Sequence, residues 1–204
     1  MNKHPLFKNV DISKYEKDFN IITYPENTLI FHEGESCYKL GIILKGQLII
    51  STLTKMDKEY VINILNKDDL FGDTLLFNDN TTYLGDGITS KETKILYIKK
   101  EYLIKMFKDE NFLLNFLAIT SKKSMDLRDR LKLLSHNSIE ERLLFYLSSK
   151  SKELNTNIIP IKSKESLAKI LNIPRPSLSR ELKKLKEKGI LEYDKYSIAL
   201  KIYK

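Results

Sequence analysis

Short runs of apolar and β-branched residues alternate with polar turns between residues 20 and 100. Runs that recur about every 8–12 residues are typical of an antiparallel sandwich or barrel. The turns are rich in Gly, Asn and Asp, and Gly46 between two apolar runs predicts a tight hairpin. We therefore expect an antiparallel β-roll with strands at residues 28–31, 39–44, 47–52, 59–65 and 93–98.

The spacing of apolar residues changes to a helical period after residue 101. Neither Pro nor Gly occurs between Glu101 and Leu134. Seven mostly apolar positions between Leu113 and Leu134 follow one another at alternating intervals of four and three residues. That alternation is a heptad seam, which favours pairing with a second helix. Thr120 and Ser124 weaken its apolar character, so packing on the chain's own β-roll is the alternative. We predict dimerisation through Leu113, Leu117, Thr120, Ser124, Leu127, Leu131 and Leu134.

A further set of signals begins at Ser138 and indicates a small helical domain. Ser138 and Glu141 have the spacing of a capping box, which predicts a helix from residue 138 to about 149. The polar stretch 150–157 is expected to end this helix, and residues 158–161 follow as a short strand. The change of pattern places a domain boundary near residue 137.

The segment from Ser163 to Lys188 has the pattern of a helix-turn-helix. Ser163 is a suitable N-cap for a short helix, and residues 172–174 interrupt that helix because proline disfavours helix in the residue before it. A second helix is expected from Arg175, with Gly189 as its C-terminal stop. Two helices joined by so short a turn are typical of a helix-turn-helix. The strands expected beyond it form a wing at residues 190–193 and 197–200.

The second helix of this pair carries a polar, basic face opposite its leucines. Arg180 can donate two hydrogen bonds to guanine in the major groove, whereas lysines, as point charges, suit phosphate contacts. The alternative is a helical hairpin with a solvated basic face, as in winged domains that bind protein. We predict that double-stranded DNA is contacted by Arg175, Ser177, Ser179, Arg180, Lys183 and Lys184.

The net charge of +8 is concentrated in the same region. Residues 160–204 contain 12 Lys and Arg against 5 Asp and Glu, a net charge of +7, whereas the first 159 residues are close to neutral. Each phosphate that a protein neutralises releases condensed counterions, so clustered positive charge favours nucleic-acid binding. A general bias toward lysine would instead spread the charge evenly.

The composition argues against several other classes of protein. No apolar stretch approaches the ~18 residues of a membrane span, and the N-terminus lacks the apolar core of a signal peptide, so we expect a cytoplasmic protein without membrane contact. Cys37 is the single cysteine, which excludes an internal disulfide. The histidines are scattered, and there is no Gly-rich phosphate loop or nucleophile motif, so we expect neither an enzyme nor a metal site.

Taken in order, these features resemble the Crp/Fnr family of bacterial transcription factors, from about residue 20 to the C-terminus. Residues 68–73 follow the family's G-D-x-F-G-E pattern with two changes, Asp68 for the first glycine and Asp73 for the glutamate. Further matches lie at residues 33–35, at Tyr38, at residues 42–46 and 140–143, and in the winged helix-turn-helix.

The resemblance implies an α+β fold and a homodimer, formed along the long helix, on a pseudo-palindromic operator. It also implies a sensor β-roll in residues 1–110, a dimerisation helix in 111–136 and a winged helix-turn-helix DNA-binding domain in 137–204. RNA polymerase is then an expected partner. The family often has glutamate where this chain has Pro176, so we expect an operator that departs from the usual half-site there while Arg180 keeps its guanine.

The sequence leaves the effector of such a regulator unknown. Aligned without gaps, the family's phosphate-binding Arg-Ser pair for cyclic AMP falls on Tyr83 and Leu84. Its adenine-binding Thr-Ser pair falls on Leu127 and Arg128. A buried phosphate without a cationic partner is costly, so cyclic AMP in the usual mode is not expected. Gly72, which matches the family, and Asp73, which stands where the family has glutamate, are expected to form a turn of the roll rather than to bind ribose. The candidate effector positions are Gly72, Asp73, Tyr83, Leu84, Leu127 and Arg128.

A haem-dependent regulator that senses nitric oxide or redox state is an alternative within the same family. Its candidate ligands are His4, His32 and His136, with Cys37 as a fourth. A lone histidine is more often an ordinary surface or core side chain than a ligand, and we expect His32 on the surface of the roll and Cys37 as a small buried side chain. A second alternative, from another class, is a β-roll ligand-binding module whose winged domain binds protein partners.

Overall fold

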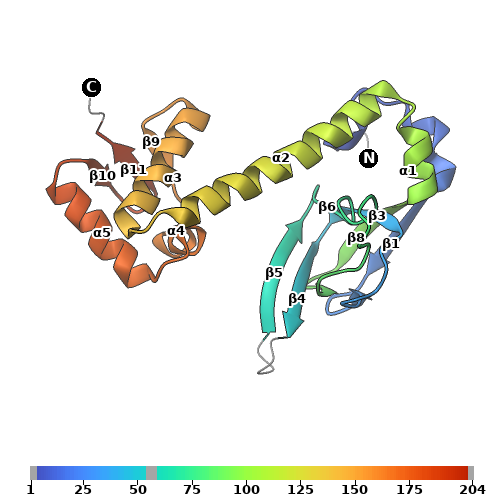
Figure 1. The fold of residues 1–204 in the computed structure, drawn as a ribbon, viewed down its shortest axis with the longest axis horizontal. Coiled ribbons are helices and arrows are strands. Elements are labelled where there is room, and N and C mark those ends of the chain that lie inside the picture. The colour runs from blue at the N-terminus through green and yellow to red at the C-terminus, as the bar shows by residue number, and fades with distance from the viewer. Residues whose placement is uncertain (1–3, 54–58, 202–204) are drawn as a thin grey trace. The chain divides into compact units, whose positions relative to one another are not determined.

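The computed structural model describes residues 4–53 and 59–201 and divides into two compact units (Figure 1). The first unit comprises Met1–Lys122 and the second Lys123–Lys204. Helix α2 (Glu110–Ser135) begins in the first unit and ends in the second. The outer ends of the predicted domains, at residues 1 and 204, lie outside the described residues. Within the described ranges, no helix is long and apolar enough to cross a membrane.

The first unit contains two four-stranded antiparallel sheets. One has the order β1-β8-β3-β6 and consists of β1 (Phe19–Tyr24), β8 (Thr93–Lys99), β3 (Lys39–Lys45) and β6 (Leu70–Phe71). The other has the order β2-β7-β4-β5 and consists of β2 (Leu29–Phe31), β7 (Asp86–Thr89), β4 (Gln47–Leu53) and β5 (Glu59–Asn66). Figure 1 shows β4 and β5 running side by side. Both sheets contribute to a single apolar core that includes Ile42, Leu48 and Ile95, so the predicted β-roll is confirmed.

Gly46 does not form the predicted hairpin. Strands β3 and β4, which flank it, belong to different sheets, so the chain crosses from one sheet to the other at this residue. Gly46 has a φ of +99°, and a Cβ there would lie 2.4 Å from the Thr93 hydroxyl oxygen. Glycine is therefore needed for both the backbone conformation and the close approach. A turn residue was visible in the sequence, but the partner strands were not.

The sequence pattern also misses β1, β6 and β7. Strand β6 is two residues long, and β7 contains Asp86 and Gly87, which are uncommon in strands. These short strands exist because longer neighbours offer them hydrogen-bonding partners. Strand β1 pairs along its whole length with β8.

The predicted helical stretch from residue 101 to 134 is two helices. Helix α1 (Lys100–Met106) ends at Phe107, and α2 begins at Glu110. The Asp109 carboxylate accepts a hydrogen bond from the backbone N–H of Phe112 at 3.1 Å and so caps α2. Because this break contains neither proline nor glycine, the helical period alone does not reveal it.

The N-terminal segment is tied to the start of α2. It forms short 3-10 turns at Pro5–Phe7, Ile12–Lys14 and Glu16–Asp18. Leu6 and Phe7 are buried in the core of the first unit. The Asn115 side chain donates hydrogen bonds to the carbonyls of Leu6, at 3.2 Å, and Lys8, at 2.8 Å.

The second unit has the predicted order of helices and strands. The capping box is confirmed: the Ser138 hydroxyl accepts from the Glu141 N–H at 3.1 Å, and the Glu141 carboxylate accepts from the Ser138 N–H at 3.4 Å. The elements are α3 (Ile139–Leu154), β9 (Ile158–Pro160), α4 (Lys164–Leu171), α5 (Arg175–Glu187), β10 (Leu191–Tyr193) and β11 (Ser197–Leu200).

Helix α3 is longer than the sequence predicts. It continues through the polar stretch to Leu154 and ends at Asn155, whose φ of +49° is left-handed. Lys150 and Glu153, three residues apart, form an ion pair at 2.6 Å on this last part of the helix. Polarity alone therefore does not mark the end of α3.

Candidate DNA-binding interface

The helix-turn-helix consists of α4 and α5, joined by residues 172–174. The Ser163 hydroxyl caps α4 by accepting from the Ser166 N–H at 3.0 Å, as predicted. Asn172 ends α4 with a φ of +53°, a left-handed conformation that asparagine tolerates. The N–H of Ile173 then donates to the carbonyl of Ala168 at 3.0 Å. Ala168 is buried, and its small side chain permits the two helices to approach each other.

Helix α5 buries one face and begins with two prolines around its first residue. Leu178, Leu182 and Leu185 are completely buried. Pro174 is the N-cap and Pro176 the second helical residue. A missing N–H is harmless there, because the first turn of a helix has no intrahelical acceptor for it.

The predicted DNA contacts all lie on α5. At roughly 100° per residue, Arg180 projects from the side opposite the buried leucines. Lys183 and Lys184 lie on either side of Arg180, and all of these cations are exposed. The structure thus brings them together on one helix face. The remaining predicted contacts lie nearer the start of the helix: the exposed Arg175 and the half-buried Ser177 and Ser179.

Acidic side chains hold part of the positive charge of α5. Glu140, at the start of α3, accepts from Lys184 at 2.8 Å and from Lys188 at 3.1 Å. Glu181 also accepts from Lys184, at 3.2 Å. The hydrogen bonds from Lys184 and Lys188 lower the pKa of Glu140, and those to Glu140 and Glu181 raise the pKa of Lys184. A DNA phosphate that binds Lys184 must therefore compete with a carboxylate.

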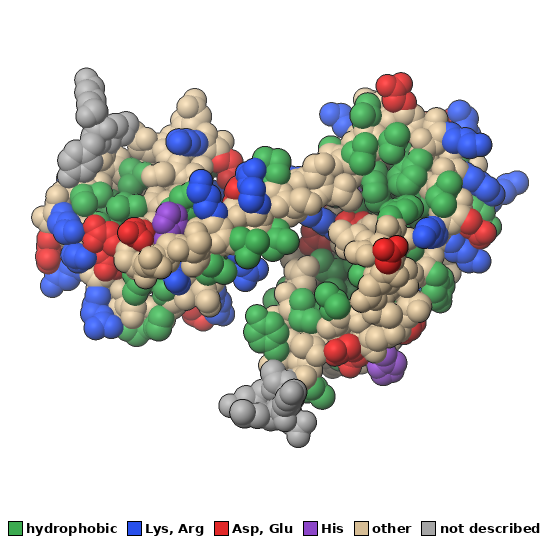
Figure 2. All heavy atoms as spheres, in the orientation of Figure 1, with side chains coloured by type: hydrophobic (Ala, Val, Ile, Leu, Met, Phe, Trp, Pro, Cys, Tyr) green, Lys and Arg blue, Asp and Glu red, His purple; other side chains and the backbone are tan. Residues whose placement is uncertain are grey.

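The arginines of α5 differ from its lysines in this respect. Lys186 is paired with Glu192 of β10 at 2.8 Å, which raises the pKa of Lys186. Across the part of the chain that the structure describes, neither Arg175 nor Arg180 forms an ion pair, and Arg180 donates only to the Ser177 hydroxyl at 3.4 Å. Figure 2 shows basic side chains grouped over α5 with acidic ones beside them. The two guanidinium groups are therefore the α5 cations without a carboxylate partner in the described part of the chain, and Lys183 is held only loosely, at 3.8 Å from Glu187.

The wing is a short hairpin of β10 and β11, as predicted. Strand β11 pairs on its other side with β9, so the wing belongs to a three-stranded sheet. The Asp194 carboxylate closes the turn by accepting from the N–H groups of Tyr196 and Ser197, both at 2.7 Å. These two hydrogen bonds lower the pKa of Asp194, so the turn is held by an ionised carboxylate at neutral pH.

The predicted dimerisation seam is a stripe along α2. Leu117 is 49% exposed, Leu127 60% and Leu131 61%. Exposed apolar patches are typical of interaction surfaces, although Thr120 and Ser124 separate Leu117 from Leu127 along the stripe. The remaining positions are half-buried or exposed and comprise Leu113, Thr120, Ser124 and Leu134. That the stripe pairs with a second chain stays a prediction.

Four candidate effector positions lie in the first unit. Gly72 has a φ of +79°, and a Cβ there would lie 2.8 Å from the Cys37 sulfur, as expected for a turn. Asp73 is buried and Leu84 is exposed. Tyr83 is buried, and its ring stacks on Phe31 with the ring centroids 3.7 Å apart. Burial raises the pKa of Tyr83, so this position holds a neutral hydroxyl.

The two other effector positions, Leu127 and Arg128, lie on the part of α2 that belongs to the second unit. Both are exposed, and the Arg128 guanidinium forms an ion pair with Asp129 at 2.9 Å. The six candidate effector positions are therefore divided between the two units, four in the first and two in the second.

The candidate haem ligands differ in environment. His4 uses both ring nitrogens: one accepts from the Leu6 N–H and the other meets the Asp68 carbonyl, each at 3.1 Å. The other candidates are the exposed His32, the buried Cys37 and His136, which packs on Phe145 with ring centroids 4.9 Å apart. Over residues 4–53 and 59–201, no group of three or more His, Cys, Asp and Glu side chains is placed to hold a metal ion.

Comparison with known proteins identifies the families to which the two parts of the chain are similar. Residues 21–110 match the cyclic nucleotide-binding domain family, and residues 141–202 match the Crp-like helix-turn-helix domain family. The chain is 24% identical over 176 residues to the anaerobic regulatory protein of Bacillus subtilis, covering 83% of this chain and 74% of that protein. It is 22% identical over 180 residues to the cAMP-activated global transcriptional regulator CRP of Escherichia coli, covering 84% and 85%.

Solved structures show the same fold. A CooA mutant from Carboxydothermus hydrogenoformans matches with a TM-score of 0.64 at 19% identity, over 99% of this chain and 92% of that one. The catabolite activator protein of Thermus thermophilus matches with a TM-score of 0.55 at 21% identity, over 97% and 93%.

A β-roll followed by a winged helix-turn-helix defines a class of transcription regulators. With both domain families matched in this order, the chain belongs to the Crp/Fnr family. It is a Crp/Fnr-type transcriptional regulator with a helix-turn-helix DNA-binding domain, and its relatives are regulators, not enzymes. The predicted family, fold class and regulatory function are thereby confirmed.

Sequence reasoning missed the acidic residues that shape this interface. Glu140 contacts Lys184 across 44 residues of chain, and Glu192 contacts Lys186 from a different strand. No local pattern marks such partners, because only the tertiary fold brings them to α5. Asp194 was the more accessible signal, since an aspartate two and three residues before the N–H groups it accepts from is a common turn motif.

Proposed function

We propose that this protein is a homodimeric regulator that recognises a pseudo-palindromic operator with α5 in the major groove. The observation that carries the proposal is the position of Arg180. It is exposed on the outer face of α5, and within the described residues no carboxylate holds it. A guanidinium in that position suits the two acceptors that guanine presents in the major groove. RNA polymerase is the proposed protein partner of the bound regulator.

The homodimer is supported by the exposed stripe on α2. Two copies related by a two-fold axis would present two α5 helices about 34 Å apart, one turn of DNA. Pro176 offers no acceptor for cytosine N4, so the operator is expected to differ from the usual family half-site at that base pair.

The effector is proposed to be a molecule other than cyclic AMP bound in the family's usual mode. Tyr83 supports this, because a buried neutral ring occupies the position that aligns with the phosphate-binding arginine. Haem is the alternative effector. Native mass spectrometry of the purified protein tests both ideas, since a bound haem adds its own mass to the dimer and an unliganded protein has none.

Replacing Arg180 by alanine tests the DNA-reading role. Binding-site selection on Arg180→Ala is expected to lose the preference for guanine at one position of each half-site, at about 1–3 kcal/mol per half-site. Lys186→Ala is the matched control, because it removes one positive charge from the same helix but from a side chain directed to Glu192. The control should keep the wild-type consensus.

Two results would contradict the proposal. If Arg180→Ala returned the wild-type consensus, the guanine contact would be wrong. If wild-type protein bound DNA with no sequence preference and little dependence on salt, the winged domain would be a protein-binding module.

A further inference from the structure

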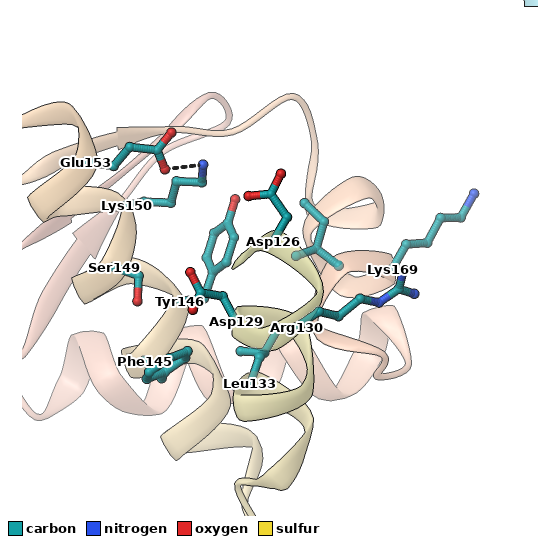
Figure 3. Close-up of a pocket in the computed structure, with 11 residues that line it drawn as sticks. Asp126, Asp129, Arg130, Leu133, Phe145, Tyr146, Ser149, Lys150, Glu153 and Lys169 are labelled. Carbon is teal, nitrogen blue, oxygen red and sulfur yellow. Dashed lines mark hydrogen bonds and ion pairs between the residues drawn. The ribbon is translucent and has the colours of Figure 1, made fainter. Parts of the chain in front are cut away.

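The second unit contains a cavity between the end of α2, α3 and α4 (Figure 3). Its volume is about 470 Å³, within the roughly 300–1,000 Å³ range of small-molecule sites in proteins. All of its lining residues belong to the same unit. The cavity is separate from the outer face of α5 and from the seam leucines, so neither proposed interface accounts for it.

Part of the cavity lining is apolar. Leu133 of α2, Phe145 of α3 and Ile170 of α4 supply this surface. Figure 3 shows Leu133 and Phe145 near each other, with Asp129 and Arg130 beside them and the Lys150–Glu153 pair farther away. An apolar group of a ligand would leave water by packing here.

Most charged side chains around the cavity already have partners. Lys150 is paired with Glu153 at 2.6 Å, and Lys169 with Glu165 at 3.4 Å. The Asp129 carboxylate is paired with Arg128 at 2.9 Å. A ligand charge would gain less free energy from these paired groups than from an unpaired one, because it would have to displace the existing partner.

Asp126 and Arg130 are the exceptions. Within the described residues, neither forms an ion pair or a side-chain hydrogen bond, although both line the cavity, and the charge of Asp126 acts on Lys150 only at longer range, where it helps to raise the pKa of Lys150. They are four residues apart on α2, so their Cβ atoms are about 5–6 Å apart on one helix face. Between the helices, the Tyr146 hydroxyl also has no hydrogen-bond partner in the described structure, and burial raises its pKa.

We propose that this cavity binds a free α-amino acid with a large apolar side chain. Its ammonium group would bind Asp126 and its carboxylate Arg130, each through a charge-assisted hydrogen bond. Its side chain would pack on Leu133, Phe145 and Ile170. A ligand that carries opposite charges on one carbon atom, next to an apolar group, matches this arrangement of one carboxylate, one guanidinium and one apolar surface.

The cavity stays accessible in the proposed homodimer. At roughly 100° per residue, Asp126 and Leu133 lie about a third of a turn around α2 from Leu127 and Leu131, whereas Arg130 lies about a sixth of a turn from Leu127. Pairing of two chains along the leucines therefore leaves Asp126 and Leu133 free and places Arg130 at the edge of the seam.

Amino-acid binding would bear on α5 through two contacts. Helix α4, which supplies Ile170, is the first helix of the helix-turn-helix, and α3 carries Glu140, which binds Lys184. A ligand that bridges α2, α3 and α4 can thus change DNA affinity, and DNA would change amino-acid affinity by the same factor. This consequence rests on the proposed function, whereas amino-acid binding itself does not.

Isothermal titration calorimetry on the full-length protein without DNA tests the binding. L-phenylalanine and L-leucine are the probes, with phenethylamine and 3-phenylpropionate as ligands that lack one charge each. We expect the amino acids to bind and the single-charge ligands to bind about tenfold more weakly or worse. Asp126→Asn and Arg130→Gln should each weaken amino-acid binding to a similar extent, whereas Lys162→Gln, a control outside the cavity, should not.

The outcomes separate cleanly. If neither amino acid binds wild-type protein, or if both variants bind as wild type does, the proposed site is wrong. Asp126 and Arg130 are exposed, so the variants are expected to fold, and circular dichroism checks this. Binding that leaves operator affinity unchanged would overturn the coupling alone, and a protein that binds no operator would overturn the DNA-reading role without affecting the titration.

Discussion

His4 is 4% exposed, and its two ring nitrogens have different partners. One nitrogen accepts a hydrogen bond from the Leu6 N–H and the other is placed to donate to the Asp68 carbonyl. Only a neutral imidazole can do both, because a protonated ring has no acceptor. Burial lowers the pKa of His4, against the smaller opposing effect of the Asp68 backbone. This residue therefore makes the attachment of the N-terminal segment sensitive to acid.

Acidification should weaken the first unit through His4. Below pH 6.5, the ordinary pKa of the ring, the unfolded chain takes up a proton that the folded form resists. The unfolding free energy then falls as the pH drops, by at most about 1.4 kcal/mol per pH unit. Urea unfolding of the first unit at several pH values measures this loss.

The His4→Gln variant isolates the contribution of this ring. It should lose part of the dependence on pH below 6.5. If His4→Gln and wild type shared one pH profile, His4 would not be the titrating group.

Helix α2 combines several surfaces on a single element. Asp109 caps its start, and Phe112 and Phe116 anchor it in the core of the first unit. Its exposed leucines form the seam, and Asp126 and Arg130 face the cavity. The helical period places the seam leucines and the cavity residues on different sides of α2, so one helix can carry both the proposed dimer seam and the cavity lining.

A double substitution tests the seam. Leu127→Glu with Leu131→Glu should make the protein a monomer if the proposed dimer forms along the seam, because like charges would meet across a surface that must lose water. Both side chains are exposed in the single chain, so the fold should persist. Sedimentation equilibrium measures the mass. Met125→Glu, at a residue that is 53% exposed on another side of α2, should remain dimeric, and a dimeric double variant would refute the seam.

At the scale of the whole molecule, charge is distributed unevenly between the two units. The net charge of +7 in residues 160–204 accounts for most of the total of +8. Two lysines of this stretch are already paired with carboxylates: Lys184 with Glu140, which lies outside the stretch, and Lys186 with Glu192, which lies within it. Lys183 is held more loosely, at 3.8 Å from Glu187. DNA affinity should therefore depend on salt through a subset of these cations.

Neutralising Lys183 should reduce that salt dependence. For Lys183→Gln, the slope of log affinity against log salt should fall by about 0.9 for each protomer on DNA, and affinity should fall to a similar extent on all sequences. Fluorescence anisotropy across a salt series measures the slope. Lys91→Gln, an equal charge change in the first unit, should leave it unchanged. An unaltered slope in Lys183→Gln would show that this lysine meets no phosphate.

The sequence by itself determined the parts of this protein whose signals are local. The capping box at Ser138, the cap at Ser163, the turn of the helix-turn-helix and the wing each depend on residues within a few positions of one another. The heptad spacing likewise follows from the helical period, and the excess of positive charge follows from counting. Such features survive any arrangement of the rest of the chain.

Only the tertiary structure decided what depends on distant residues. Gly46 crosses between sheets because β3 and β4 find different neighbours, and Lys184 meets Glu140 from 44 residues away. The cavity exists because α2, α3 and α4 pack without filling the space between them. Pairing, ion-pair partners and voids are set by how elements meet, and the periodicity of any one segment carries no information about them.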